Sequence, residues 1–209
     1  MARYRGPDCR VCRRYGLKLF LKGERCLSPK CAIERRNQPP GPPPKGRRRK
    51  ISDRGLQLRE KQKARYSYGV LERQFHSYFE EATRLPGVTG ENLVRILESR
   101  LDNVVYRLGF SDSRDQGRQL VNHGHITLNG RKTDIASALT KVGDVVGWTP
   151  QGQKTEYAAV LRQEIGRASP PSWLSLDKDN LTGRVIAPPV RTEADQTFDE
   201  SVIVEYYSR

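Results

Sequence analysis

Long apolar stretches are missing from this sequence. No run approaches the roughly 18 residues that a membrane-spanning helix needs, and the start, Met1-Ala2-Arg3-Tyr4-Arg5, has no apolar segment behind it that would make a signal peptide. We therefore expect a cytoplasmic protein with no membrane partner, in a compartment where thiols stay reduced.

Recognisable catalytic motifs are missing too. The sequence has no Gly-rich phosphate loop and no cluster of His, Asp and Ser suited to nucleophilic chemistry. Two other classes of protein are disfavoured. An RNA-modifying enzyme would need the catalytic residues that are missing. A zinc-dependent DNA-binding regulator would need a Cys2His2 pattern or a heptad dimer seam, and both are lacking. We expect a protein that is not an enzyme and has no small-molecule substrate.

Cysteine is scarce and confined to one place. The chain has 4 cysteines, arranged as Cys9-x2-Cys12-x13-Cys26-x4-Cys31. Two short-loop thiol pairs of this kind are typical of one structural zinc ion, which we predict here with these four residues as ligands. Disulfides are disfavoured in a reducing compartment. An iron–sulfur cluster is the minor alternative, since the sequence lacks a compact three-cysteine run.

Positive charge is abundant but unevenly placed. The formal net charge is +14, and residues 1–65 hold 21 of the 38 Lys and Arg residues but only 5 of the 24 Asp and Glu residues. An excess confined to the first third predicts a polyanionic partner touched mainly by that end of the molecule.

The densest positive segment follows a proline-rich linker. Residues 39–44 are five prolines and one glycine, and residues 45–50 contain five cations. We interpret the latter as a phosphate-binding arm, the alternative being a solvated tail or a localisation signal. The candidate phosphate contacts in and after the arm are Arg47, Arg48, Arg49, Lys50, Arg54, Arg59, Lys61 and Lys63.

Helical periodicity dominates the middle of the chain. We predict helices over residues 52–65, with Ser52 or Asp53 as N-cap, over 71–84 with an aromatic core stripe, and over 89–108. Ser113 and Gln116 form a capping-box pattern that opens a shorter helix to about Asn122.

Strand patterns dominate the rest. Residues 125–128 alternate, Asn129-Gly130 is a tight-turn signal, and a return strand is expected from Thr133. We predict further strands over 141–148, 173–176, 184–186 and 201–207, a helix over 154–166, and core positions for both tryptophans.

Several of these segments resemble one family. The long motif lies in residues 98–109, 113–114 and 119–130, with shorter matches at 3–4, 6–7, 21–26, 28–31, 34–36, 58–63, 68–69, 173–177 and 206–209. Together they closely resemble bacterial small-subunit ribosomal protein four, in its zinc-bearing four-cysteine form.

The resemblance implies an α+β fold in three parts. Residues 1–50 would be a zinc-binding knot with its linker and basic arm, residues 51–98 plus 170–209 a helical body completed by C-terminal strands, and residues 99–165 a small helix–helix–strand RNA-binding module. The family's role would be a structural constituent of the small ribosomal subunit that binds 16S rRNA at a multi-helix junction in the 5′ domain and nucleates assembly. Neighbouring small-subunit proteins and the region where mRNA enters would lie nearby, and decoding accuracy would depend on it.

The module supplies the remaining candidate RNA contacts, which are Arg100, Asn103, Arg107, Arg114, Arg118, Gln119, His123, His125, Asn129, Arg131 and Lys132. We expect Arg114, Arg118 and Gln119 to project outward from their helix. The two histidines could instead satisfy backbone groups at the helix end. Gly117 departs from the alanine common in the family and should weaken the helix, and Asp112 and Asp115 make this face less basic.

Overall fold

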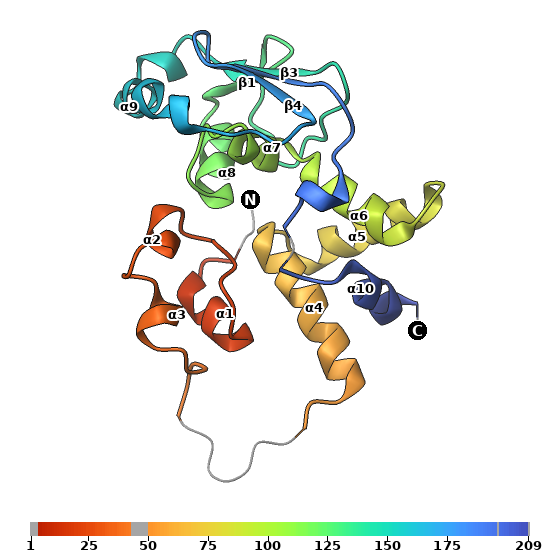
Figure 1. Ribbon diagram of the computed structural model, residues 1–209. Coiled ribbons are helices and arrows are strands. Elements are labelled where there is room, and N and C mark those ends of the chain that lie inside the picture. The colour runs from red at the N-terminus through yellow and green to blue at the C-terminus, as the bar shows by residue number, and fades with distance from the viewer. Residues whose placement is uncertain (1–3, 43–49, 196, 209) are drawn as a thin grey trace. The chain divides into compact units, whose positions relative to one another are not determined.

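The structure, a computed structural model, describes residues 4–42, 50–195 and 197–208 and divides the chain into two compact units (Figure 1). Unit 1 comprises residues 1–94 and 195–209, and unit 2 comprises residues 95–194. Helices combine with one small antiparallel sheet, which confirms the α+β class. In the part of the chain that is described, no helix is long and apolar enough to cross a membrane.

Unit 1 is helical. Its helices are α1 (Asp8–Tyr15), α2 (Glu24–Leu27), α3 (Ala32–Arg35), α4 (Asp53–Ser67), α5 (Glu72–Arg84) and α10 (Glu200–Tyr207), while α6 (Thr89–Glu98) continues into unit 2. The Ser52 hydroxyl accepts a 3.2 Å hydrogen bond from the Gly55 amide, so Ser52 is the N-cap of α4. Phe75 and Tyr78 of α5 are buried, which confirms the predicted aromatic core stripe.

The C-terminal segment differs from the prediction. Residues 201–207 alternate like a strand, but they form helix α10, which packs against α4. The Asp199 carboxylate accepts from the Ser201 amide at 2.9 Å and starts the helix. Tyr207 donates a 2.9 Å hydrogen bond to Glu72, and Ile203 is buried. These tertiary contacts outweigh the β-propensity of the Val-Ile-Val run, and the expected return of the C-terminus onto its own unit is confirmed.

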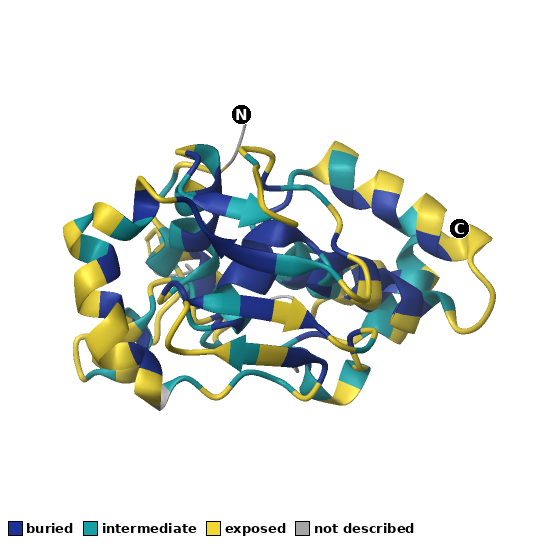
Figure 2. Ribbon diagram, turned by 90° about the horizontal axis from the view of Figure 1, so that it is seen from above, coloured by how far each residue is buried: buried dark blue, intermediate teal, exposed yellow. Residues whose placement is uncertain are grey.

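Unit 2 contains the sheet. Its strands are β1 (Ile126–Leu128), β2 (Arg131–Lys132), β3 (Val145–Trp148), β4 (Leu174–Asp177) and β5 (Thr182–Val185), in the antiparallel order β2-β1-β3-β5-β4. The return strand thus begins before Thr133, and β4 and β5 extend this sheet through β3 instead of completing the helical body. Buried positions lie along β1, β3, β4 and β5, whereas both residues of β2 are exposed (Figure 2). Both tryptophans belong to the core, as predicted.

The helix predicted over residues 89–108 is interrupted. After α6 ends at Glu98, Arg100 is extended, with ψ at 138°, and forms a bridge to Leu139 before α7 (Leu101–Arg107) begins. The Leu101 amide donates to the Ala138 carbonyl at 2.8 Å. Hydrogen bonds to another segment therefore replace the helical ones at this break, and apolar periodicity alone could not reveal it.

Helix α8 (Arg114–Asn122) packs closely on α7 at Gly117, and α9 (Glu156–Glu164) follows later in the same unit. Short 3-10 turns lie at Gly152–Lys154, Ile165–Arg167 and Arg191–Glu193. A Cβ on Gly117 would lie 2.8 Å from the Asp102 carbonyl oxygen and 2.9 Å from the Ser111 hydroxyl. Gly117 therefore permits a close approach of the two helices. From the sequence we expected only that this glycine weakens its own helix.

We predict that Gly117→Ala destabilises the protein. Alanine is the better helix former by about 0.5–1 kcal/mol, but its methyl group meets a backbone oxygen that can move only with α7. The overpacking cost of about 1–3 kcal/mol should therefore win. Thermal unfolding measures the change. Gly166→Ala is the matched control, since a Cβ there meets nothing within 4 Å; equal melting temperatures for the two variants would contradict the close-approach argument.

Candidate nucleic-acid interface

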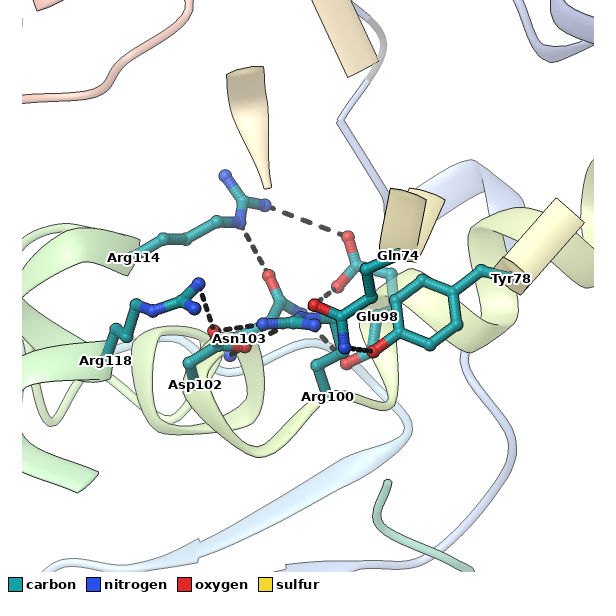
Figure 3. Close-up of polar contacts among 8 residues, drawn as sticks. All are labelled: Gln74, Tyr78, Glu98, Arg100, Asp102, Asn103, Arg114 and Arg118. Atoms are coloured by element: carbon teal, nitrogen blue, oxygen red, sulfur yellow. Dashed lines mark hydrogen bonds and ion pairs between the residues drawn. The ribbon is translucent and has the colours of Figure 1, made fainter. Parts of the chain in front are cut away.

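Two buried carboxylates organise the polar side chains of α7 and α8. Glu98 is 1% exposed and Asp102 is 3% exposed. Each lies beside arginines from the same unit (Figure 3). Buried carboxylates are costly unless charged and polar partners surround them, so this arrangement fixes the conformations of its neighbours.

Asp102 holds two arginines. The Arg100 Nε donates to Oδ1 at 3.0 Å and its Nη2 to Oδ2 at 2.5 Å, a two-bond pair with fixed geometry. The Arg118 Nη1 lies 3.6 Å from Oδ2. Both arginines are buried, so the expectation that Arg118 projects outward is wrong.

Glu98 binds the other polar side chains of the cluster, Asn103, Arg107 and Arg114. It accepts from Asn103 Nδ2 at 2.7 Å and from Arg107 Nε and Nη2 at 2.9 Å and 2.6 Å. Arg114 Nη2 lies 3.8 Å away, and Arg114 Nε donates to the Asn103 amide oxygen at 2.6 Å. The side chains of Arg107 and Arg114 keep 16% and 10% exposure. Four guanidinium groups against two carboxylates leave the network positive, with these two arginines nearest to solvent.

The end of α8 and the β1–β2 turn present a second group of polar side chains. Gln119, His123, Arg131 and Lys132 are exposed, while His125 is half-buried. The two histidine rings are 6.0 Å apart. A Cβ on Gly124 would lie 2.2 Å from Lys132 Cε, so the Lys132 chain lies directly against the end of α8.

Asn129 has a structural task in that turn. Its Nδ2 donates to Asp144 and its Oδ1 accepts from the Val145 amide, each at 2.8 Å. Its φ of 52° is a left-handed value that asparagine tolerates better than most residues. The exposed Arg131 and Lys132 are thereby held on a rigid hairpin.

The predicted contacts on α4 are partly occupied. Lys61 is buried and lies 2.6 Å from Glu72, Lys63 lies 2.6 Å from Glu60, and the Arg54 guanidinium stands 3.9 Å from the Tyr206 ring centroid. Arg59 is half-buried and Lys50 is exposed. Arg47, Arg48 and Arg49 fall outside the described residues.

The four cysteines are free thiols in unit 1. Cys12, Cys26 and Cys31 are buried and Cys9 is half-buried. Burial raises the pKa of the Cys12 thiol, and the nearby Cys26, Cys9 and Cys31 raise it further. Among residues 4–42, 50–195 and 197–208, however, no three His, Cys, Asp or Glu side chains come together as a metal-binding group.

Comparison with known proteins identifies the family. Residues 3–98 match the "Ribosomal protein S4/S9 N-terminal domain", and residues 99–146 match the "S4 domain". The chain is 56% identical to "Small ribosomal subunit protein uS4" of Heliobacterium modesticaldum and 54% identical to that of Pelotomaculum thermopropionicum. It is also 56% identical to that of Geobacter sp. strain M21, and each alignment covers 209 residues and 100% of both chains.

The chain belongs to the uS4 family. The family resemblance read from residues 98–130 is thus confirmed over the whole length. Sequence reasoning missed the part played by Glu98 and Asp102, which lie in the same uS4 motif. Two acids four residues apart among Arg100, Asn103 and Arg107 were the available signal, because buried arginines need carboxylate partners.

We predict that Glu98→Gln destabilises unit 2 by about 1–3 kcal/mol. Glutamine keeps the shape and one acceptor but removes the charge that Arg107 and Arg114 face, and Arg107 regains some hydration because it is partly exposed. Chemical denaturation provides the measurement. Glu164→Gln removes an exposed carboxylate of α9, so its effect should stay within about 0.5 kcal/mol. Equal losses for the two variants would show that the network carries no special stability.

Proposed function

We propose that this protein is an rRNA-binding structural constituent of the small ribosomal subunit, working in the ribosomes of the cytoplasm. One observation carries the proposal: relatives named small ribosomal subunit protein uS4 align with the whole chain at about 55% identity. The same full-length match favours a ribosome-building protein over an RNA-modifying enzyme or a DNA-binding regulator.

The RNA partner is 16S rRNA, bound at a multi-helix junction of the 5′ domain early in assembly. Residues 99–165 act as the RNA-binding module, and within unit 2 their sheet is extended by β4 and β5. The knot and arm of residues 1–50, together with residues 51–65 of the helical part, add the positive charge of the first third. Neighbouring small-subunit proteins and the region where mRNA enters lie close to the bound protein, which thereby contributes to decoding accuracy.

Within the module, the candidate residues divide into two roles. Gln119, His123, Arg131 and Lys132 are exposed and meet RNA directly, and the partly exposed Arg107 and Arg114 add two further contacts. Arg100, Asn103 and Arg118 are buried, so they position the others through Glu98 and Asp102. A rigid surface of this kind suits the recognition of RNA shape and unpaired elements.

Zinc is the second part of the proposal, with Cys9, Cys12, Cys26 and Cys31 as its ligands. The chemistry of four thiols fits, and burial raises the pKa of Cys26, while Lys22 donates its amide hydrogen to that sulfur at 3.3 Å. A bound cation would favour the thiolates that burial disfavours, so metal and fold would stabilise each other. An iron–sulfur cluster remains the minor alternative and is distinguished by its colour.

Cys26→Ser should release the metal and leave residues 1–42 sensitive to protease, because so small a unit has little core of its own. Elemental analysis of the purified protein should find one zinc ion per wild-type chain and less in the variant. Full zinc retention by Cys26→Ser, or iron in the wild type, would contradict this assignment.

RNA binding should divide between charge and shape. Replacing the five cations of residues 45–50 by Gln should flatten the dependence of log Kd on log salt by up to about 0.7–0.9 per lost phosphate contact, equally for the 16S 5′ domain and for random duplex. Replacing Gln119, Arg131 and Lys132 together should weaken 5′-domain binding more than duplex binding. Filter-binding salt titrations measure both effects.

The matched control for the module variant replaces Lys154 and Arg162, which are exposed in the same unit. It should leave the preference for the 5′ domain unchanged. A module variant that loses both RNAs to the same extent would refute the division of roles, and a wild-type protein without affinity for the 5′ domain would refute the proposed function.

A further inference from the structure

Unit 1 contains a cavity between α1 and α4 that the family motifs do not explain. Its volume is about 430 Å³, and it is lined by Arg14, Tyr15, Leu58, Arg59, Gln62 and Tyr66. The size falls within the range of about 300–1,000 Å³ seen for small-ligand sites. Two aromatic rings, two guanidinium groups and one amide form an unusual lining for a simple packing defect, which is normally apolar.

The Arg59 guanidinium lies over the Tyr15 ring in this cavity, and its Nη2 donates to the Tyr15 backbone carbonyl at 3.4 Å. The guanidinium carbon of Arg59 lies 5.8 Å from the Tyr15 ring centroid, whereas Arg54 lies 3.9 Å from the ring of Tyr206. Arg59 is therefore not in stacking contact. A flat group inserted between ring and guanidinium needs two contacts of about 3.5 Å each, which a shift of roughly 1 Å would provide.

Tyr66 forms the side of the cavity. Its ring centroid lies 6.4 Å from that of Tyr15, and the Arg65 guanidinium covers it at 4.5 Å. Tyr4 meets the same ring edge-on at 5.3 Å. These neighbours hold the Tyr66 ring in place. The ring therefore forms a fixed wall of the cavity and does not collapse onto Tyr15.

Gln62 supplies a polar group that points to a ligand. Its Oε1 is buried and has no hydrogen-bond partner among the described residues. A buried amide oxygen without a partner costs about 1–3 kcal/mol. A ligand that brings an N–H group to this position would recover that cost.

We propose that this cavity binds one unpaired nucleotide of the rRNA, with its base between the Tyr15 ring and the Arg59 guanidinium and a base N–H donating to Gln62 Oε1. This inference rests on the proposed function and adds a defined subsite to it. Aromatic rings and guanidinium planes are the surfaces on which proteins stack splayed RNA bases. Arg14, exposed at the rim, is placed to meet the adjoining phosphate.

Charge alone does not account for such a site. A phosphate needs cations, but it needs neither an aromatic ring nor a buried amide acceptor. Conversely, an apolar small molecule would leave Gln62 unsatisfied and Arg59 desolvated. Of the ligands consistent with a basic protein surface, a base attached to its phosphate matches the whole lining.

The test uses the full-length protein and the 16S rRNA 5′ domain. Tyr15→Leu should weaken binding by about 5- to 100-fold, as for the loss of one base stack, while Tyr15→Phe should retain near wild-type affinity. Arg59→Lys should weaken binding by about 2- to 5-fold without changing the salt slope, because it keeps the charge but loses the plane. Arg73→Lys, exposed on α5, is the matched control and should have no effect.

A second measurement reads the nucleotide itself. Ultraviolet irradiation of the complex, followed by mass spectrometry, should find a nucleotide attached to the peptide that carries Tyr15 or Tyr66, and Gln62→Leu should reduce that yield. The subsite would be overturned if the wild type binds the 5′ domain, Tyr15→Leu and Arg59→Lys bind it with the same affinity, and no nucleotide is attached at Tyr15 or Tyr66. That result would leave the proposed function intact. Arg59→Lys protects the test against misfolding of Tyr15→Leu.

Discussion

The pairing of two buried carboxylates with four arginines is the constraint on which unit 2 depends. Glu98 and Asp102 are buried, and their burial would be costly without the partners Arg100, Arg107, Arg114 and Arg118. The arginines, in turn, would be mobile on a bare surface. Each group removes the other's cost, so the same contacts that hold α7 against α8 also set the positions of the cations nearest to solvent.

This arrangement explains how the arginines of α7 and α8 can be held rigidly. Exposed lysines and arginines lose side-chain entropy when they bind, which lowers affinity. Arg107 is already held by two hydrogen bonds to Glu98, so most of that loss has occurred before RNA arrives. The sequence of the basic arm, residues 45–50, contains no Asp or Glu that could pair with its cations. This composition suits the arm to non-selective attraction of phosphate.

Local signals predicted what is locally determined. Ser52, Ser113 and the Asn129-Gly130 turn were identified correctly because capping and turn formation depend on a few adjacent residues. The break at Arg100 and the helical C-terminus were not, since a bridge to Leu139 and packing on α4 involve residues far away in sequence. The candidate interface shows the same division. The exposure of Arg131 could be predicted from its place in a tight turn. The burial of Arg118 could not, because it depends on the partner Asp102, and its sequence position resembles that of any helix-surface arginine. The zinc ligands rest on cysteine spacing, and the domain limits on resemblance; both stay predictions.

The order of the strands and helices affects how the chain can fold as it is synthesised. The sheet begins at β1, but its edge strand β4 and its neighbour β5 come about fifty residues later, and α4 packs on α10 from the far end of the chain. Neither unit can therefore complete its core until late segments have emerged. Such distant pairings slow folding and leave α4 and β3 uncovered in the meantime. A nascent chain with a basic first third would be available to bind polyanions throughout that interval, so RNA can act on this protein before its own fold is finished.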